Sequence, residues 1–194
     1  MTTNNNKKLQ AQKTRKMIIE TATRLFARQG YHKTTINDIC QAIGLTSGAV
    51  FGHFPSKEAL LLEVISWVER GIIYYADYLN QAKAGSLKVI EGLFKIMCDH
   101  FNRYPEATFC LASLSAEFAG SNHPVEKRLK EIYERWAKAF SRILKNHPKV
   151  KDKRIAALVF IGVAQGIAIQ CLLREEDLTA DQMTKAFLSM LADW

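Results

Sequence analysis

Residues 35–54 constrain the fold more than any other stretch, because they encode two short helices joined by a tight turn. Thr35 can N-cap the first helix, and Asp38, three residues later, can complete a capping box. Apolar residues at helical spacing follow, and Gly44 can adopt the left-handed conformation that ends a helix. The stretch therefore predicts a helix-turn-helix.

The second helix of this pair carries small and hydroxyl-bearing residues near its start. Thr46 or Ser47 can cap it, and apolar residues give it one buried side. Small residues at such a helix start let a protein backbone approach a DNA duplex closely. An ordinary helical corner is the alternative interpretation. The residues on the other face of the helix are Ser47, Gly48, Phe51, Gly52 and His53.

Positive charge is concentrated around this pair of helices. Residues 1–57 contain nine basic and two acidic side chains, which places seven of the chain's formal net charge of +8 in this part. The other 137 residues, with 18 basic and 17 acidic side chains, are nearly neutral. A solvated helical face normally mixes its signs, so a basic end beside a helix-turn-helix favours a phosphate-binding module.

A set of spaced residues between Thr14 and Leu62 adds a family resemblance. Its members are Leu25, Phe26, Gly30, Tyr31, Thr34, Thr35, Asp38, Ile39, Ala42, Gly44, Leu45, Gly48, His53, Phe54, Ser56, Lys57, Glu58 and Leu60. In this pattern the run resembles the N-terminal DNA-binding domain of the TetR family of bacterial transcriptional regulators. So many matches over about fifty residues make the resemblance specific.

The resemblance implies which residues contact DNA. The second helix of the pair would enter the major groove, Asn37 would reach the groove edge, and Thr35 and Lys57 would hold the phosphate backbone. Lys33 would help by its charge. The implied DNA-binding residues are Lys33, Thr35, Asn37, Thr46, Ser47, Gly48, Phe51, His53 and Lys57.

The chain departs from the family pattern just before His53. Two aromatic residues, often Tyr followed by Tyr or Trp, usually stand where this chain has Phe51 and Gly52. The departure removes a phosphate hydrogen bond and a stacking surface. Phe51 could instead touch a thymine methyl group, or it could fill the small core of the head.

The rest of the chain reads as helical, because it has four prolines and no alternating apolar pattern typical of strands. We predict an all-α protein of about nine helices. An N-terminal helix-turn-helix head of three helices occupies residues 1–56, and a larger helical body for effector binding and dimerisation occupies residues 57–194. Residues 1–8 are expected to be a disordered arm, which trails along the DNA or has no role, before a first helix at about 13–29.

The uncharged run at 155–173 is long enough to reach the lower limit for spanning a bilayer. Gln165 and Gln170 interrupt it, and its many small residues suit close helix packing, so burial in a helical bundle is favoured over a membrane anchor. TetR-like proteins usually dimerise through a four-helix bundle built from such helices, which implies a palindromic operator. The expected dimer residues are Ala157, Ala164, Ala168, Cys171, Phe187, Met190 and Leu191.

The middle helices, at about 85–146, are where this family binds its inducers. Their aromatic and polarizable residues suit an apolar pocket, although each could simply belong to the core, and Glu117 could face solvent. The candidate ligand-binding residues are Met97, Phe101, Phe109, Leu114, Glu117, Phe118, Trp136, Phe140 and Gln165. Cys98, His100 and Cys110 match no zinc spacing, so no metal site or cofactor is expected.

Catalytic signatures are lacking: there is no glycine-rich phosphate loop, no nucleophile elbow and no diagnostic pairing of His with Asp. The resemblance to the TetR family implies a repressor that is released from its operator DNA by a small apolar or aromatic inducer. A TetR-like regulator controlled by a partner, or an enzyme built on the helical body, is the alternative. Four scattered cysteines and no signal peptide indicate a cytoplasmic protein without a membrane partner.

Overall fold

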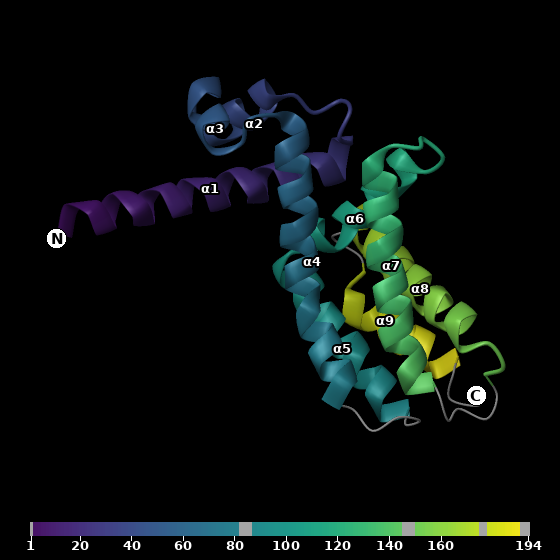
Figure 1. Ribbon diagram of the computed structural model, residues 1–194. Helices are drawn as coiled ribbons and strands as arrows, with labels where there is room; N and C mark the ends of the chain where they lie inside the picture. The colour runs from purple at the N-terminus through teal and green to yellow at the C-terminus, as the bar shows by residue number, and fades with distance from the viewer. Residues whose placement is uncertain (1, 82–86, 145–149, 175–177, 191–194) are drawn as a thin grey trace.

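The computed structural model describes residues 2–81, 87–144, 150–174 and 178–190, and within them it is all-helical, as predicted (Figure 1). α1 and α4 cross near the head, and α5 to α9 form the body below it. In chain order the nine helices of the described residues are α1 (Thr2–Gln29), α2 (Ile36–Ile43), α3 (Ser47–His53), α4 (Lys57–Gln81), α5 (Leu87–Arg103), α6 (Pro105–Phe118), α7 (Pro124–Ile143), α8 (Lys153–Leu173) and α9 (Ala180–Met190).

The first helix differs from its prediction, since α1 begins at Thr2 instead of following a disordered arm at 1–8. No glycine or proline interrupts residues 2–29, and the Lys, Gln, Leu and Ala residues in this stretch favour a helix. Residues 5–13 are all exposed, and the first buried residue is Ile18. Figure 1 shows the purple start of α1 standing out from the other helices.

A buried apolar core joins the head to the body. Ile18 of α1, Ile39 of α2 and Val50 of α3 belong to the same cluster as Leu111 of α6 and Ile132 of α7. Full burial of each such side chain stabilises the fold by about 1.5–3 kcal/mol. The core is continuous across the predicted boundary between residues 56 and 57, and that boundary remains a prediction.

A second buried cluster holds the body together between α5, α7, α8 and α9. The rings of Phe140 and Phe160 stack with their centroids 5.5 Å apart, and Phe94 lies 6.2 Å from Phe160. Phe187 of α9, predicted at the dimer interface, has its ring 5.4 Å from that of Phe94. The Phe187 side chain therefore packs, at least on one side, against the core of its own protomer.

Local signals set most helix ends. Asp152 caps α8 by accepting a 2.9 Å hydrogen bond from the N–H of Ile155. Thr179 and Gln182, whose spacing in the sequence predicts a capping box, form one at the start of α9. Pro105 and Pro124 occupy the first turns of α6 and α7, where a missing N–H costs nothing. Gly85 and Ser86, where the sequence predicts the start of the next helix, lie outside the described residues.

Among the described residues, α8 alone has the length and apolar composition that could cross a bilayer. One side of it is nevertheless buried in the protomer, at Ala157, Phe160, Ile167, Ala168 and Cys171. This burial supports the predicted role of the run as a bundle helix. It also occupies three residues that the sequence had assigned to the dimer interface.

Candidate nucleic-acid interface and ligand pocket

The helix-turn-helix is fixed by the bonds that its sequence predicts. The Thr35 N–H donates to Asp38 Oδ2 at 2.7 Å, and the Asp38 N–H donates to Thr35 Oγ1 at 3.1 Å. The backbone bond from Thr35 holds the pKa of Asp38 below its usual value. Gly44 has φ +67°, the left-handed conformation required there.

Thr46, rather than Ser47, caps α3, since its Oγ1 accepts a 3.2 Å hydrogen bond from the Ala49 N–H. Ser47 and Gly48 are exposed at the helix start. A Cβ added at Gly48 would meet nothing closer than 4.0 Å, so packing within the protein does not require a glycine there. The open surface suits the close approach of another molecule.

Phe51 is 48% exposed, so it does not fill the core of the head, which was one of the two alternatives for this residue. Val50 and Phe54 fill the core of the head instead, with exposed fractions of 0% and 3%. The neighbouring Gly52 also faces open space. Phe51 is thus a solvent-facing ring on the exposed side of α3, where the predicted contact with a thymine methyl group is sterically open.

The other predicted DNA contacts lie around α3. Lys33, Thr35, Asn37 and Thr46 are exposed, and His53 is half-buried at the end of the helix. These residues come from the start of α2, the start of α3 and the segment before α2. Their exposure leaves Lys33, Thr35, Asn37 and Thr46 open to contact by another molecule.

Lys57, the ninth predicted DNA contact, is half-buried and is held by the protein itself. Its Nζ donates to the carbonyl oxygens of Tyr31 and Thr34, each at 2.9 Å, and lies 4.2 Å from the centre of the Tyr31 ring. A lysine ammonium has three hydrogens, so one remains for a phosphate. Lys57 at least fastens the loop between α1 and α2.

Glu117 of α6 fastens the same loop from the other side. Its carboxylate accepts hydrogen bonds from the N–H groups of Tyr31 at 2.7 Å and His32 at 2.6 Å. Burial raises the pKa of Tyr31, and the Glu58 and Glu117 carboxylates add to the shift. The structure therefore places Glu117 at the joint between head and body rather than in the predicted ligand site.

Gly30 is required at this joint. Its φ is +88°, and an added Cβ would lie 3.3 Å from Glu117 Oε2. A side chain at position 30 would therefore strain the backbone and would also crowd the Glu117 carboxylate. We call residues 30–34, with Lys57 and Glu117, the loop clamp.

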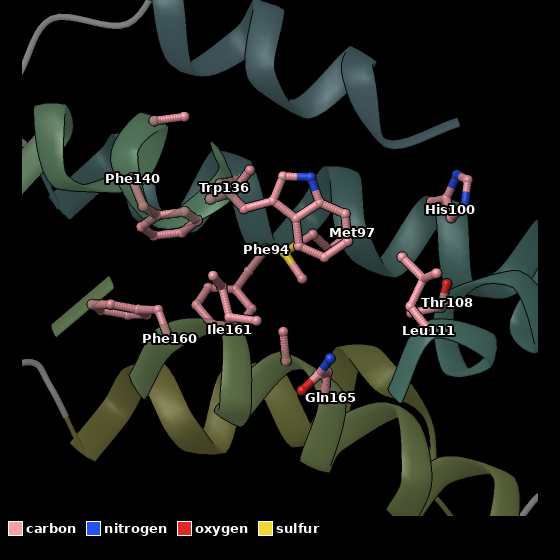
Figure 2. A pocket seen from close by; sticks show the side chains of 13 residues that line it. Phe94, Met97, His100, Thr108, Leu111, Trp136, Phe140, Phe160, Ile161 and Gln165 are labelled. Atoms are coloured by element: carbon pink, nitrogen blue, oxygen red, sulfur yellow. The ribbon is translucent and has the colours of Figure 1, made fainter. Parts of the chain in front are cut away.

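A pocket lies in the body between α5, α6, α7 and α8 (Figure 2). Its empty space is about 840 Å³, counted out to the solvent at its open side. Phe94, Trp136 and Phe140 surround it in Figure 2, and Gln165 contributes an amide from α8. The lining residues are Leu93, Phe94, Met97, His100, Thr108, Leu111, Trp136, Ala139, Phe140, Phe160, Ile161, Ala164 and Gln165.

The pocket contains part of the predicted ligand set. Met97, Trp136, Phe140 and Gln165 line it, and Phe101 lines a smaller adjoining cavity. The remaining apolar candidates lie in or against the core shared by head and body; they are Phe109, Leu114 and Phe118. Phe160 and Ile161 were missed because α8 is apolar on all sides, so its sequence does not reveal which side faces α7.

The polar groups of the pocket wall are uncharged near neutral pH. Burial lowers the pKa of His100, and the nearby Arg103 lowers it further, so the imidazole is neutral. Gln165 Nε2 donates to the Tyr133 hydroxyl at 2.6 Å, and the Ser115 and Tyr133 hydroxyls lie 3.3 Å apart. Burial raises the pKa of Tyr133, which keeps its proton. Asp, Glu, Lys and Arg are not among the described lining residues.

The predicted dimer residues occupy several places. Ala157, Ala168 and Cys171 are buried within the protomer, and Ala164 lines the pocket. Met190 is 77% exposed, as an interface residue of a separate protomer should be. Leu191 lies outside the described residues. The large apolar side chains that α8 does expose are Ile155, Val159 and Leu173.

Within the described ranges, no group of three or more His, Cys, Asp or Glu side chains is placed to hold a metal ion. All four cysteines are free and buried. Complete burial raises the pKa of Cys110 to about 12, and Cys98 Sγ lies 3.2 Å from Thr184 Oγ1. These thiols behave as small apolar groups.

The fold and the exposed α3 define a helix-turn-helix protein with a helical body. A family model described as "Bacterial regulatory proteins, tetR family" matches residues 18–64. The "Probable acrEF/envCD operon repressor" of Escherichia coli (strain K12) is 44% identical over 63 residues, which are 32% of this chain and 28% of that protein. The aligned part thus spans less than a third of that relative. The match identifies the helix-turn-helix head, residues 18–64, as similar to the TetR family of bacterial regulatory proteins.

Likeness outside the head is weaker but extends over the body. The "Nucleoid occlusion factor SlmA" of Aliivibrio fischeri (strain MJ11) is 24% identical over 151 residues, 75% of this chain and 76% of that protein. The crystal structure of the MbdR regulator from Azoarcus sp. CIB has a TM-score of 0.80 at 24% identity and covers 91% of this chain and 95% of that one. At this identity the structural likeness shows the fold.

Proposed function

We propose that the protein is a homodimeric transcriptional repressor that binds a palindromic operator through its two α3 helices. An uncharged apolar or aromatic molecule in the α5–α8 pocket would release it. The observation that carries the DNA-binding part is the exposed start of α3 within residues 1–57, which hold seven of the chain's eight net positive charges. The relatives and the head sequence favour a cytoplasmic regulator over an enzyme.

The chemistry of the pocket supports the ligand class. A charged ligand would lose its hydration without meeting an opposite charge on the described wall, and this loss costs several kcal/mol. An uncharged aromatic or apolar ligand would gain about 25 cal/mol for each Å² that it buries. The adjoining cavity shares Phe94, Met97, Thr108 and Ala164 with the pocket, so an elongated molecule fits best.

Two protomers would meet through α8 and α9. Ile155, Val159 and Leu173 of α8 are 57%, 59% and 72% exposed, and together with Met190 they leave apolar surface that a second copy can cover. A two-fold dimer would present two α3 helices at about 34 Å or somewhat more, the distance of one DNA turn, which fits a palindrome.

Release requires a ligand that binds more tightly to the state with lower operator affinity. α6 offers a direct connection, because Thr108 and Leu111 line the pocket and Glu117 holds the loop clamp. A ligand that shifts α6 would move the support of the segment before α2. α4, which carries Lys57, would move with the same loop.

Selection of genomic DNA fragments by the purified protein, followed by footprinting, tests this function. The expected result is an enriched palindrome protected on two half-sites, with one dimer bound per site. The recovered duplex then serves to screen uncharged aromatic compounds for release. A folded protein that selects no sequence even at low salt would overturn operator binding.

Control by a partner protein is the second candidate, because the likeness to the nucleoid occlusion factor extends beyond the head. Ala164→Phe, which fills the space shared by both cavities, separates the two. If a ligand controls the protein, this variant keeps its operator affinity and responds at least tenfold less to a compound found in the screen. Ala116→Phe, at an exposed site on α6 outside both cavities and the proposed dimer surface, is the matched control. An unchanged response in Ala164→Phe would exclude this pocket as the ligand site.

A further inference from the structure

The first half of α1 has no role in the fold. Residues 5–13 are exposed, and buried contacts begin only at Ile18. At a rise of about 1.5 Å per residue, residues 5–13 extend roughly 14 Å beyond the packed part of the helix. Figure 1 shows the purple start of α1 running past α3 and away from the other helices.

Its charge has a single sign. Residues 2–19 include Lys7, Lys8, Lys13, Arg15 and Lys16 but no acidic residue. Arg15 forms an ion pair with Glu63 at 3.0 Å, and Lys16 lies 3.6 Å from Glu20. Within the described part of the chain, the other three lysines form no ion pair. Like charges on an uncovered helix repel one another and weaken it.

The packed part of α1 fixes where this extension starts. The Arg15 guanidinium lies 4.9 Å from the centre of the Phe54 ring, and Phe54 is the residue that ends α3. Ile18 and Ile19 are buried in the same core as Val50. The extension therefore leaves the head beside α3 and adds its lysines to the positive charge of the head.

We propose that residues 5–16 are a second DNA-binding surface, in which Lys7, Lys8 and Lys13 bind backbone phosphates of the DNA that flanks each half-site. This proposal rests on the proposed operator binding. Double-stranded DNA is the occupant that fits, because it offers a continuous row of negative charges next to α3. At 3.4 Å per base pair, the extension reaches about four base pairs of flanking DNA.

The test replaces all three lysines by glutamine, in Lys7→Gln, Lys8→Gln and Lys13→Gln together. A matched control makes the same charge change on the body, with Lys127→Gln, Lys138→Gln and Lys185→Gln, all of them exposed. A third variant carries arginine at positions 7, 8 and 13 and keeps the charge. Affinity is measured against salt concentration on the selected operator, with flanking DNA and with the flanks trimmed to the palindrome.

Each lost phosphate contact should make the slope of log K against log salt shallower by about 0.9 and raise the Kd about fivefold at 0.15 M salt. The wild type and the arginine variant should bind the flanked operator more tightly than the trimmed one. The glutamine variant should lose that preference and keep the wild-type melting temperature.

An unchanged salt slope and flank preference in the glutamine variant would overturn the proposal, and so would an equal loss in the body control. Failure of the wild type to select any operator would instead overturn the proposed function. The same three variants would then be compared on random-sequence duplex at low salt. There, equal salt slopes for glutamine and wild type would exclude the extension as a DNA contact.

Discussion

The loop clamp and the ligand pocket are held together by opposite means. Two full charges, on Lys57 and Glu117, fix the backbone of residues 30–34 at hydrogen-bonding distance. The pocket is enclosed by aromatic and aliphatic side chains, whose attraction depends on buried area and not on direction. Directional bonds specify one position for the reading helices, whereas the apolar wall can adjust to the shape of its contents.

The largest expected effect comes from removing one side of the clamp. Glu117→Ala leaves two backbone N–H groups without their acceptor, so the free energy of unfolding should fall by about 2–3 kcal/mol. Operator affinity should fall as well, because the segment before α2 loses its support. Urea denaturation and operator titration measure the two effects.

The free energy of unfolding of Glu117→Gln should lie between those of Glu117→Ala and the wild type, since the amide retains one acceptor oxygen. Glu131→Ala on α7 removes an exposed carboxylate 4.0 Å from Arg128 and should cost less than about 1 kcal/mol. If Glu117→Ala denatured at the wild-type urea concentration, the clamp would not hold the loop in solution.

A smaller effect is expected at Gly30, where alanine would be forced into the left-handed region beside Glu117. Gly30→Ala should destabilise the protein by about 1–2 kcal/mol in thermal or urea denaturation. Gly52→Ala, at an open helical site, should leave stability unchanged or raise it by up to about 1 kcal/mol. Additive losses in Gly30→Ala combined with Glu117→Ala would show that the crowding at the carboxylate has no energetic consequence.

The pocket should show the smallest effect, as a dependence on pH. The folded pKa of His100 lies below its usual 6.5. As the pH falls below about 6.5, the unfolded chain binds a proton that the folded protein resists, so stability is lost down to the folded pKa. Because the imidazole is partly exposed, the loss should stay below about 1 kcal/mol.

Melting temperatures of wild type and His100→Gln between pH 7.5 and 5.5 measure this effect. The variant should lose less stability than the wild type over that range. Identical profiles would mean that His100 is solvated in the folded protein. Burial in the pocket wall would then not disfavour the protonated imidazole.

The sequence predicted the parts of the fold that depend on near neighbours. The capping boxes of α2 and α9 join residues three positions apart, so the residue types alone reveal them. Glu117 and Tyr31 are 86 positions apart, and no local pattern connects them. The buried side of α8 could not be predicted either, since a helix that is apolar all round has no periodicity to follow.

The start of α1 illustrates the opposite limit. Its asparagines and lysines suggested disorder, yet they form helical turns as the continuation of a long helix whose later part is buried. Extending an existing helix avoids the cost of starting a new one. Composition describes the segment as if it were isolated, and it does not reveal that the segment continues into the buried part of α1.

The position of α6, between the pocket wall and the loop clamp, has a consequence for measurement. Coupling between two binding sites is reciprocal, so a ligand that lowers operator affinity must itself bind more weakly to the operator complex, by the same factor. A ligand dissociation constant obtained with DNA-free protein would therefore overstate the affinity of the promoter-bound dimer. The concentration that switches a gene would depend on the number of operator sites competing for the protein.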